Sequence, residues 1–127
     1  MNRDKILKME AGRELDVLVA RILFGNLPFI QKRKRAAKKD YYSIWAVKTK
    51  SGGYGKLPFY STDIAAAWQI AEKLQEFYPC LWKEDGYWEC LFAVEYATAT
   101  ADTAPLAICR AALLAMEVER ETETSTR

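Results

Sequence analysis

The chain has 127 residues, of which 50% are hydrophobic, 13% aromatic and 28% charged. This composition excludes a disordered or fibrous chain and predicts one globular domain over residues 1–118, followed by a polar tail over 119–127. No apolar run approaches the roughly 20 residues of a membrane span, and the charged start carries no secretory signal. Three cysteines without metal-ligand spacing favour a reducing compartment. We therefore expect a cytoplasmic protein that does not contact membranes.

The sequence contains no histidine. This absence excludes a Ser-His-Asp triad, a Cys-His pair and a zinc site with imidazole ligands. Carboxylates, lysine, tyrosine or cysteine with shifted pKa values are the remaining candidates for proton transfer near pH 7. The sequence therefore favours a non-catalytic protein without a cofactor or a metal, with a His-independent phosphodiesterase-like activity as the enzymatic alternative.

Positive charge is concentrated in residues 26–40, which we predict to form a connecting loop. The net charge is +2, and without six basic residues in this loop the balance is 13 basic against 17 acidic residues, or −4. This loop is interpreted either as a solvated surface loop or as a loop that contacts phosphate or nucleic acid. No aromatic residue lies between the basic ones, and such a run is only a weak signal of nucleic-acid binding. A second loop, 51–56, lacks the pattern of a phosphate-binding loop. The six basic residues are Lys32, Arg33, Lys34, Arg35, Lys38 and Lys39.

Residues 3–24 are predicted to form one helix, because apolar residues recur at steps of three and four. Gly25 and Asn26 end this helix. Gly12 lies inside it, where a glycine costs about 1 kcal/mol relative to alanine. We therefore expect another backbone or a ligand to approach closely at Gly12.

A further helix is predicted over residues 63–77, ending before Pro79. Ser61 or Thr62 is the expected N-cap, while Asp63 is the alternative group that would satisfy the N–H groups of the first turn. If those N–H groups stay free, this helix end can hold an anion. The residues expected on the buried face are Ile64, Ala67, Trp68, Ala71, Leu74 and Phe77.

Two stretches are predicted to form strands. Residues 41–48 alternate and are rich in aromatic and β-branched side chains. Residues 80–96 are predicted to form a hairpin, since Asp85-Gly86 is a strong two-residue turn signal. This turn places Leu81 opposite Cys90 on the face that packs against the helices, so the cysteines are not expected to form a disulfide.

The last helix is predicted to open at Asp102 or Thr103. Arg110 is the one charged residue between positions 104 and 116, so this helix is expected to be covered on more than one side. A lone buried charge is costly, which means that Arg110 either pairs with a carboxylate or contacts an anionic ligand. The candidate carboxylates are Glu14, Asp16 and Asp63.

These elements together predict an α+β fold of the α/β/α sandwich type, with about three helices packed on a small antiparallel sheet. The hairpin 80–96 and the strand 41–48 are expected to share that sheet. Sequence reasoning cannot establish this pairing, but one sheet is the most economical arrangement.

The chain contains three segments in order: MEAGRELD at 9–16, PFYSTDIAAAW at 58–68 and APLAICRAALL at 104–114. Together they resemble the small phage proteins with an ABA-sandwich domain and, more distantly, the NinX-like phage proteins. The resemblance implies a phage or prophage origin and an α/β sandwich. It implies no catalytic activity and supplies no catalytic residues. The basic loop and the extended tail depart from the family pattern.

We interpret the chain as a non-catalytic, oligomeric phage protein that binds and sequesters a nucleotide-like small molecule, such as a second messenger of bacterial antiphage defence. Aromatic side chains would stack on a base, and arginines with helix N-termini would hold phosphates. The alternative is an accessory protein that binds a host protein or nucleic acid through its basic loop. The candidate ligand-binding residues are Arg13, Trp45, Tyr60, Ser61, Thr62, Asp63, Trp68, Trp82, Thr103 and Arg110.

Overall fold

The computed structural model describes residues 3–35, 40–93 and 97–125, with side chains up to residue 117. Within these ranges the chain forms helices and antiparallel strands, and the predicted α+β class is confirmed. The helices are α1 (Arg3–Lys8), α2 (Arg13–Phe24), α3 (Ile64–Lys73), the 3-10 helix η1 (Gln75–Phe77) and α4 (Ala104–Ser125). The strands are β1 (Phe29–Lys34), β2 (Tyr41–Lys48), β3 (Tyr54–Lys56), β4 (Cys80–Glu84), β5 (Tyr87–Phe92) and β6 (Ala97–Ala101).

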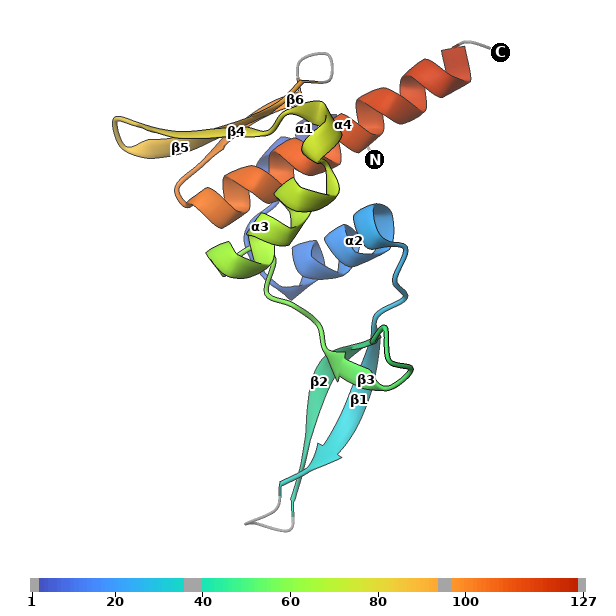
Figure 1. Cartoon of the computed structure of the whole chain (residues 1–127). Coiled ribbons are helices and arrows are strands. Elements are labelled where there is room, and N and C mark those ends of the chain that lie inside the picture. Colours follow the sequence, from blue (N-terminus) through green and yellow to red (C-terminus); the bar gives the residue numbers. More distant parts are fainter. Residues whose placement is uncertain (1–2, 36–39, 94–96, 126–127) are drawn as a thin grey trace.

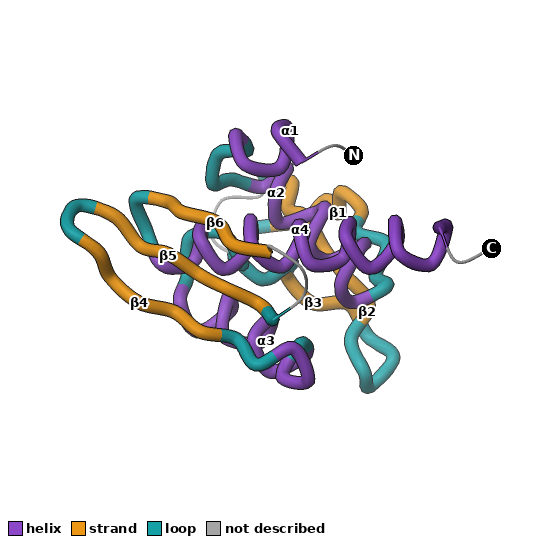
Figure 2. The backbone as a smooth tube through the Cα atoms, turned by 90° about the horizontal axis from the view of Figure 1, so that it is seen from above, coloured by secondary structure: helices purple, strands orange, loops and turns teal. Residues whose placement is uncertain are grey.

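Helix α4 lies at the centre of the molecule (Figure 1). It packs against β5 and β6 on one side and against α1, α2 and α3 elsewhere. Seen from above, the sheet that contains β4, β5 and β6 lies across α4, with α1 and α3 on opposite sides of the helix (Figure 2). Ile108, Leu113 and Leu114 are buried at these contacts. The prediction of a helix covered on more than one side is therefore confirmed.

The limits of α4 agree with the sequence at one end and differ at the other. The helix begins at Ala104, and the Ala107 N–H donates to the Thr103 carbonyl in its first turn. It then continues to Ser125, whereas a polar tail was expected over 119–127. Residues 117–125 include four glutamates and one arginine, which are good helix formers.

The strands form two separate three-stranded sheets, so the expectation of one shared sheet is wrong. β2 pairs with β1 on one edge and with β3 on the other, and β5 pairs with β4 and β6. The neighbours that the sequence analysis did not assign are β1 and β3 beside β2, and β6 beside β5. β6 is an alternation of alanine and threonine that lacks large apolar residues.

The hairpin between β4 and β5 has the predicted register. Glu84 lies opposite Tyr87 across the Asp85-Gly86 turn, and Leu81 lies opposite Cys90. Cys90 is buried against the helices and its thiol is free, as expected. The predicted hairpin extended to residue 96, but residues 94–96 lie outside the described part of the chain.

The helix predicted over 3–24 is interrupted, because α1 ends at Lys8 and α2 begins at Arg13. Gly12 adopts φ +156°, a conformation that L side chains rarely adopt. No heavy atom lies within 4 Å of where a Cβ would stand, so the glycine is not required by a close approach on that side. The glycine instead permits the chain to change direction before α2. At the other end, Gly25 takes the left-handed conformation and ends α2 as predicted.

Helix α3 is capped by the alternative residue, Asp63, whose carboxylate accepts from the Ala65 N–H at 3.2 Å. Of the face predicted to be buried, Ala67, Ala71 and Leu74 are buried. Ile64 and Trp68 are instead exposed, and Ala66 and Ile70 are buried in addition. The apolar positions at steps of three and four therefore identified only part of the inward face.

Residues 29–34 form strand β1, which corrects that part of the loop predicted over 26–40. Lys38 and Lys39 of the predicted loop lie outside the described residues. β2 pairs with the whole length of β1, and the two strands extend away from the helices as a projecting arm (Figure 1). Residues 51–56 form a turn and the short strand β3. Across the described ranges, no helix is both long and apolar enough to cross a membrane.

Candidate functional site

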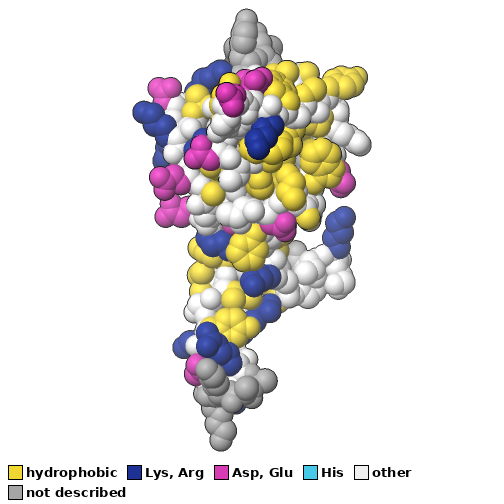
Figure 3. Space-filling view, turned by 90° about the vertical axis from the view of Figure 1, so that its left-hand side faces the viewer, with side chains coloured by type: hydrophobic (Ala, Val, Ile, Leu, Met, Phe, Trp, Pro, Cys, Tyr) yellow, Lys and Arg dark blue, Asp and Glu magenta, His cyan; other side chains and the backbone are white. Residues whose placement is uncertain are grey.

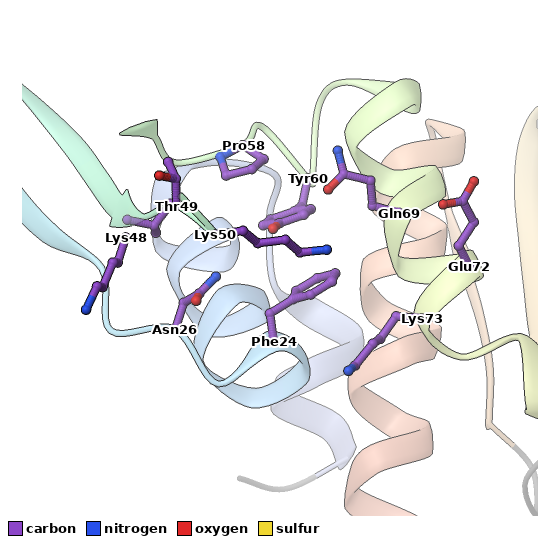
Figure 4. Close-up of a pocket in the computed structure, with 11 residues that line it drawn as sticks. Phe24, Asn26, Lys48, Thr49, Lys50, Pro58, Tyr60, Gln69, Glu72 and Lys73 are labelled. Atoms are coloured by element: carbon purple, nitrogen blue, oxygen red, sulfur yellow. The ribbon is translucent and has the colours of Figure 1, made fainter. Parts of the chain in front are cut away.

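A pocket of about 800 Å³ lies where the projecting arm joins the helices (Figure 4). Its size falls within the range typical of small-molecule sites. Four parts of the chain form its walls: the end of α2, the end of β2 with its following turn, the segment before α3, and α3 itself. The lining residues are Phe24, Asn26, Val47, Lys48, Thr49, Lys50, Pro58, Tyr60, Gln69, Glu72 and Lys73.

Two aromatic rings form the apolar part of this pocket. Phe24 and Tyr60 stack with 5.3 Å between ring centroids and 12° between planes. Tyr60 is only 2% exposed, whereas Phe24 is half-buried. Phe24 is therefore the ring that can offer surface to a planar guest, and Tyr60 supports it from behind.

Lysines dominate the charge of the pocket. Lys50 extends from the turn after β2 toward α3, Lys73 extends from α3 toward α2 with its ammonium directed away from that of Lys50, and Lys48 points away (Figure 4). Glu72 is the acidic lining residue, so the lining carries a net charge of +2. Thr49 and Gln69 add neutral hydrogen-bonding groups. This combination can hold a small anion against an aromatic surface.

Three buried titratable groups, of which Tyr60 lines the pocket, are held in their protonated forms. Burial, with a smaller contribution from Asp16, raises the pKa of Tyr60 to about 12. Burial also raises the pKa of Cys90 to about 12 and raises the pKa of Cys109 further. At neutral pH these are a phenol and two thiols rather than a phenolate and thiolates, so none of the three is an activated nucleophile.

Arg13, a predicted ligand contact, is bound within the protein. Its guanidinium donates to the Asp16 carboxylate at 2.9 Å and to the carbonyls of Pro58 and Leu57 at 3.0 and 2.7 Å. The same group lies 3.6 Å from the centroid of the Phe59 ring. Arg13 thus ties the start of α2 to the segment before α3.

Ser61 belongs to the same network rather than to a helix cap. Its backbone N–H and its hydroxyl both donate to Asp16 Oδ1, at 2.8 and 2.7 Å, and its hydroxyl oxygen accepts from the Gly12 N–H at 2.9 Å. Ser61 is fully buried, and Asp16 is 1% exposed. The segments 9–16 and 58–68, noted above for their resemblance, therefore meet in one buried network.

Arg110 does not pair with any of the carboxylates proposed for it. Its Nε and Nη2 donate to the Met9 carbonyl at 2.9 and 2.7 Å, and its Nη1 donates to the Thr100 carbonyl at 2.9 Å. Burial lowers the pKa of Arg110, while Asp102 and Glu10 oppose the shift. Arginine still stays charged at neutral pH. Arg110 therefore connects α4 to the segment before α2 and to β6.

The remaining candidate residues do not form one site. Thr62 and Thr103 are exposed near the starts of α3 and α4, and the Asp63 carboxylate already caps α3. Among the tryptophans, Trp45 packs partly against the core, and the Trp82 indole donates to Glu84 at 3.0 Å. Trp68 is 50% exposed. Of the ten predicted residues, only Tyr60 lines the pocket.

Sequence reasoning missed the three pocket lysines and Phe24. Lys48 and Lys50 flank the end of β2, and Lys73 is in the last turn of α3, where a basic residue favourably meets the helix dipole. Each lysine by itself is an ordinary surface residue. A cluster of this kind is detectable only once the turn after β2 is known to face α3.

Comparison with known proteins places the chain in a family. Residues 18–113 match the model of the phage ABA sandwich domain. A solved crystal structure of a phage protein from Bacillus cereus ATCC 14579 is also similar: it is 26% identical, the match covers 84% of this chain and 92% of that one, and the TM-score is 0.58. No curated protein matches the chain.

The matched range includes the segment 58–68 and all but the last residue of 104–114, while 9–16 lies before it. The three segments nevertheless form one connected structure, through the Ser61 network and the Arg110 bonds to Met9. The match spans about three quarters of the chain. The chain therefore belongs to the phage ABA sandwich domain family.

Proposed function

We propose that this protein is a non-catalytic phage protein that binds and sequesters a small, anionic, nucleotide-like molecule in the lysine-lined pocket. The observation that carries the proposal is the pocket of about 800 Å³ that Lys50 and Lys73 line together with Phe24. Ammonium groups suit phosphates, and an exposed aromatic edge suits a base.

The chemistry around the pocket favours binding over turnover. Tyr60 and the two buried cysteines have raised pKa values, which keep them neutral at physiological pH. The sequence offers no histidine as a general base. A guest would therefore be held by charge and stacking, and released unchanged.

The family relation suggests where such binding would matter. In the cytoplasm of an infected bacterium, a phage protein that captures a nucleotide second messenger would keep it from the effectors of antiphage defence. Assembly into an oligomer would raise the number of sites per particle. Sponge activity of this kind requires affinity and copy number rather than catalysis.

A thermal-shift assay tests the binding proposal. Purified protein is heated with cyclic dinucleotides, cyclic ADP-ribose isomers and mononucleotides as separate probes. A ligand at about 100 times its Kd adds about 2.7 kcal/mol of stability, which raises Tm measurably. Chromatography of the heated sample should then recover the probe chemically unchanged.

A double variant assigns the binding to the pocket. Lys50→Gln with Lys73→Gln should weaken binding about tenfold or more, since a hydrogen bond to a charged group contributes about 1.5–3 kcal/mol. The matched control, Lys8→Gln with Lys83→Gln, removes the same charge from exposed positions outside the pocket and should bind normally. Equal weakening in both variants, or turnover of the probe, would contradict the proposal.

A further inference from the structure

The arm formed by β1 and β2 carries a second functional feature. We call residues 29–35 and 40–46 the basic ribbon. Its strands pair antiparallel, with Lys34 opposite Tyr41 and Ile30 opposite Trp45. The ribbon extends away from the helical body (Figure 1), and basic and apolar side chains gather on it while acidic ones lie mostly on the body (Figure 3).

Both faces of the basic ribbon are positively charged. Successive residues of a strand point to opposite faces, so Lys32 and Lys34 share one face while Arg33 and Arg35 follow the other. Asp40 is the acidic residue of the ribbon, 3.9 Å from Arg35 in a solvent-exposed pair. Such a pair is weak in water and leaves the ribbon strongly basic.

Strand pairing places aromatic rings among these charges. Lys32 Nζ lies 5.6 Å from the centroid of the Tyr41 ring, and Arg35 Cζ lies 5.3 Å from that of Tyr42. Tyr41 is 59% exposed, and its neighbour across the ribbon is Lys34. The basic run has no aromatic residue along the sequence, but the fold supplies them from the opposite strand. Aromatic and basic groups in alternation are typical of nucleic-acid surfaces.

We propose that the basic ribbon binds double-stranded nucleic acid by entering a groove. A two-stranded ribbon fits a major groove of roughly 12 Å width. The six paired residues of β1 extend over roughly 20 Å, at about 3.3 Å per residue. A groove has phosphates on both walls, which matches a ribbon charged on both faces. A single strand would engage only one face.

The contacts would be mainly electrostatic. Lysine and arginine side chains at the ribbon surface meet phosphates, which fix position without reading sequence. Binding should therefore depend weakly on sequence and steeply on salt, with the logarithmic salt slope rising by about 0.9 for each phosphate neutralised. The ribbon and the pocket use different residues, so their functions can be separated.

Fluorescence anisotropy with a short labelled duplex tests this proposal. The full chain is titrated at several salt concentrations between about 50 and 200 mM. The variant Lys32→Gln, Lys34→Gln and Arg35→Gln should lose about tenfold or more in affinity, and its salt slope should fall by about 3. The control Lys8→Gln, Arg21→Gln and Lys83→Gln removes the same charge from exposed positions on the body. This control should keep the affinity and the salt slope of the unmodified protein.

Circular dichroism melting checks that both variants fold. All changed side chains are exposed, so Tm should stay close to that of the unmodified protein. Absence of duplex binding, equal losses in both variants, or tighter binding of the single strand than of the duplex would overturn the proposal. It would also be overturned if sedimentation showed a dimer that Ile30→Ser with Tyr41→Ser dissolves, because the ribbon would then be a subunit contact.

Discussion

The helical body and the basic ribbon of this protein differ in how their polar groups are used. In the body, Arg13, Asp16 and Arg110 are bound by partners within the fold. In the ribbon, lysines and large apolar residues face solvent, and Ile30 is 54% exposed. The same kinds of side chain thus support the fold in one region and remain available in the other. Side chains that face solvent, such as the lysines of the basic ribbon, can contact a binding partner.

The strongest test of this contrast is removal of the buried carboxylate of the body. Asp16→Ala should lower the free energy of unfolding by about 3–5 kcal/mol, because it leaves the buried Ser61 N–H without its acceptor and removes the carboxylate that pairs with Arg13. Urea denaturation measures the loss. Glu14→Ala, an exposed acidic residue in the same turn of α2, is the matched control and should stay within about 0.5 kcal/mol.

Apolar truncation compares the two regions directly. Leu114→Ala in α4 should cost about 2–5 kcal/mol, since Leu114 is fully buried and its removal leaves a cavity. Ile30→Ala in the basic ribbon should change stability by less than about 0.5 kcal/mol. Similar losses at both positions in urea denaturation would show that the ribbon is covered in solution, which would contradict an open binding surface.

Removal of the Arg110 side chain should have a smaller effect. Arg110→Ala breaks hydrogen bonds to the carbonyls of Met9 and Thr100, and we expect a loss of about 2 kcal/mol. Hydrogen exchange should show the loosening first at α1 and at β6, which this guanidinium connects to α4. Unchanged stability together with loss of nucleotide binding would instead identify Arg110 as a ligand contact.

Local patterns in the sequence were enough for much of the fold. The 41–48 strand, the Asp85-Gly86 turn with its register and the start of α4 follow from alternation, turn chemistry and capping. β1 was not predicted because basic residues make up much of its sequence, and β6 was not predicted because it consists of alanine and threonine. Both are held in place by a partner strand rather than by their own propensity.

The site was less accessible to sequence reasoning for a physical reason. Arg13 and Arg110 were assigned to anions, but each is bound by backbone carbonyls, which are present at every residue and carry no signal in a sequence. The pocket forms from lysines on separate elements, of which Lys50 and Lys73 are 23 positions apart. Of the predicted ligand-binding residues, Tyr60 alone lines the pocket, and it was predicted because it is an aromatic residue just before a predicted helix.

The smallest expected effect is a loss of stability at high pH that involves Tyr60. Its folded pKa of about 12 lies above the ordinary value of 10.0, so the folded state holds the proton more tightly than the unfolded state does. The stabilising contribution is complete below pH 10, and it is lost at about 1.4 kcal/mol for each pH unit as pH rises toward 12. The free energy of unfolding of Tyr60→Phe should fall less over this interval, so that at pH 11 its loss is about 1 kcal/mol smaller than that of the unmodified protein. Cys90, whose folded pKa is also about 12, contributes a decline of the same sign, so some loss should persist in the variant. Urea denaturation of both proteins from pH 8 to 11 measures the difference, and parallel curves would show that Tyr60 is more accessible to solvent than its 2% exposure indicates.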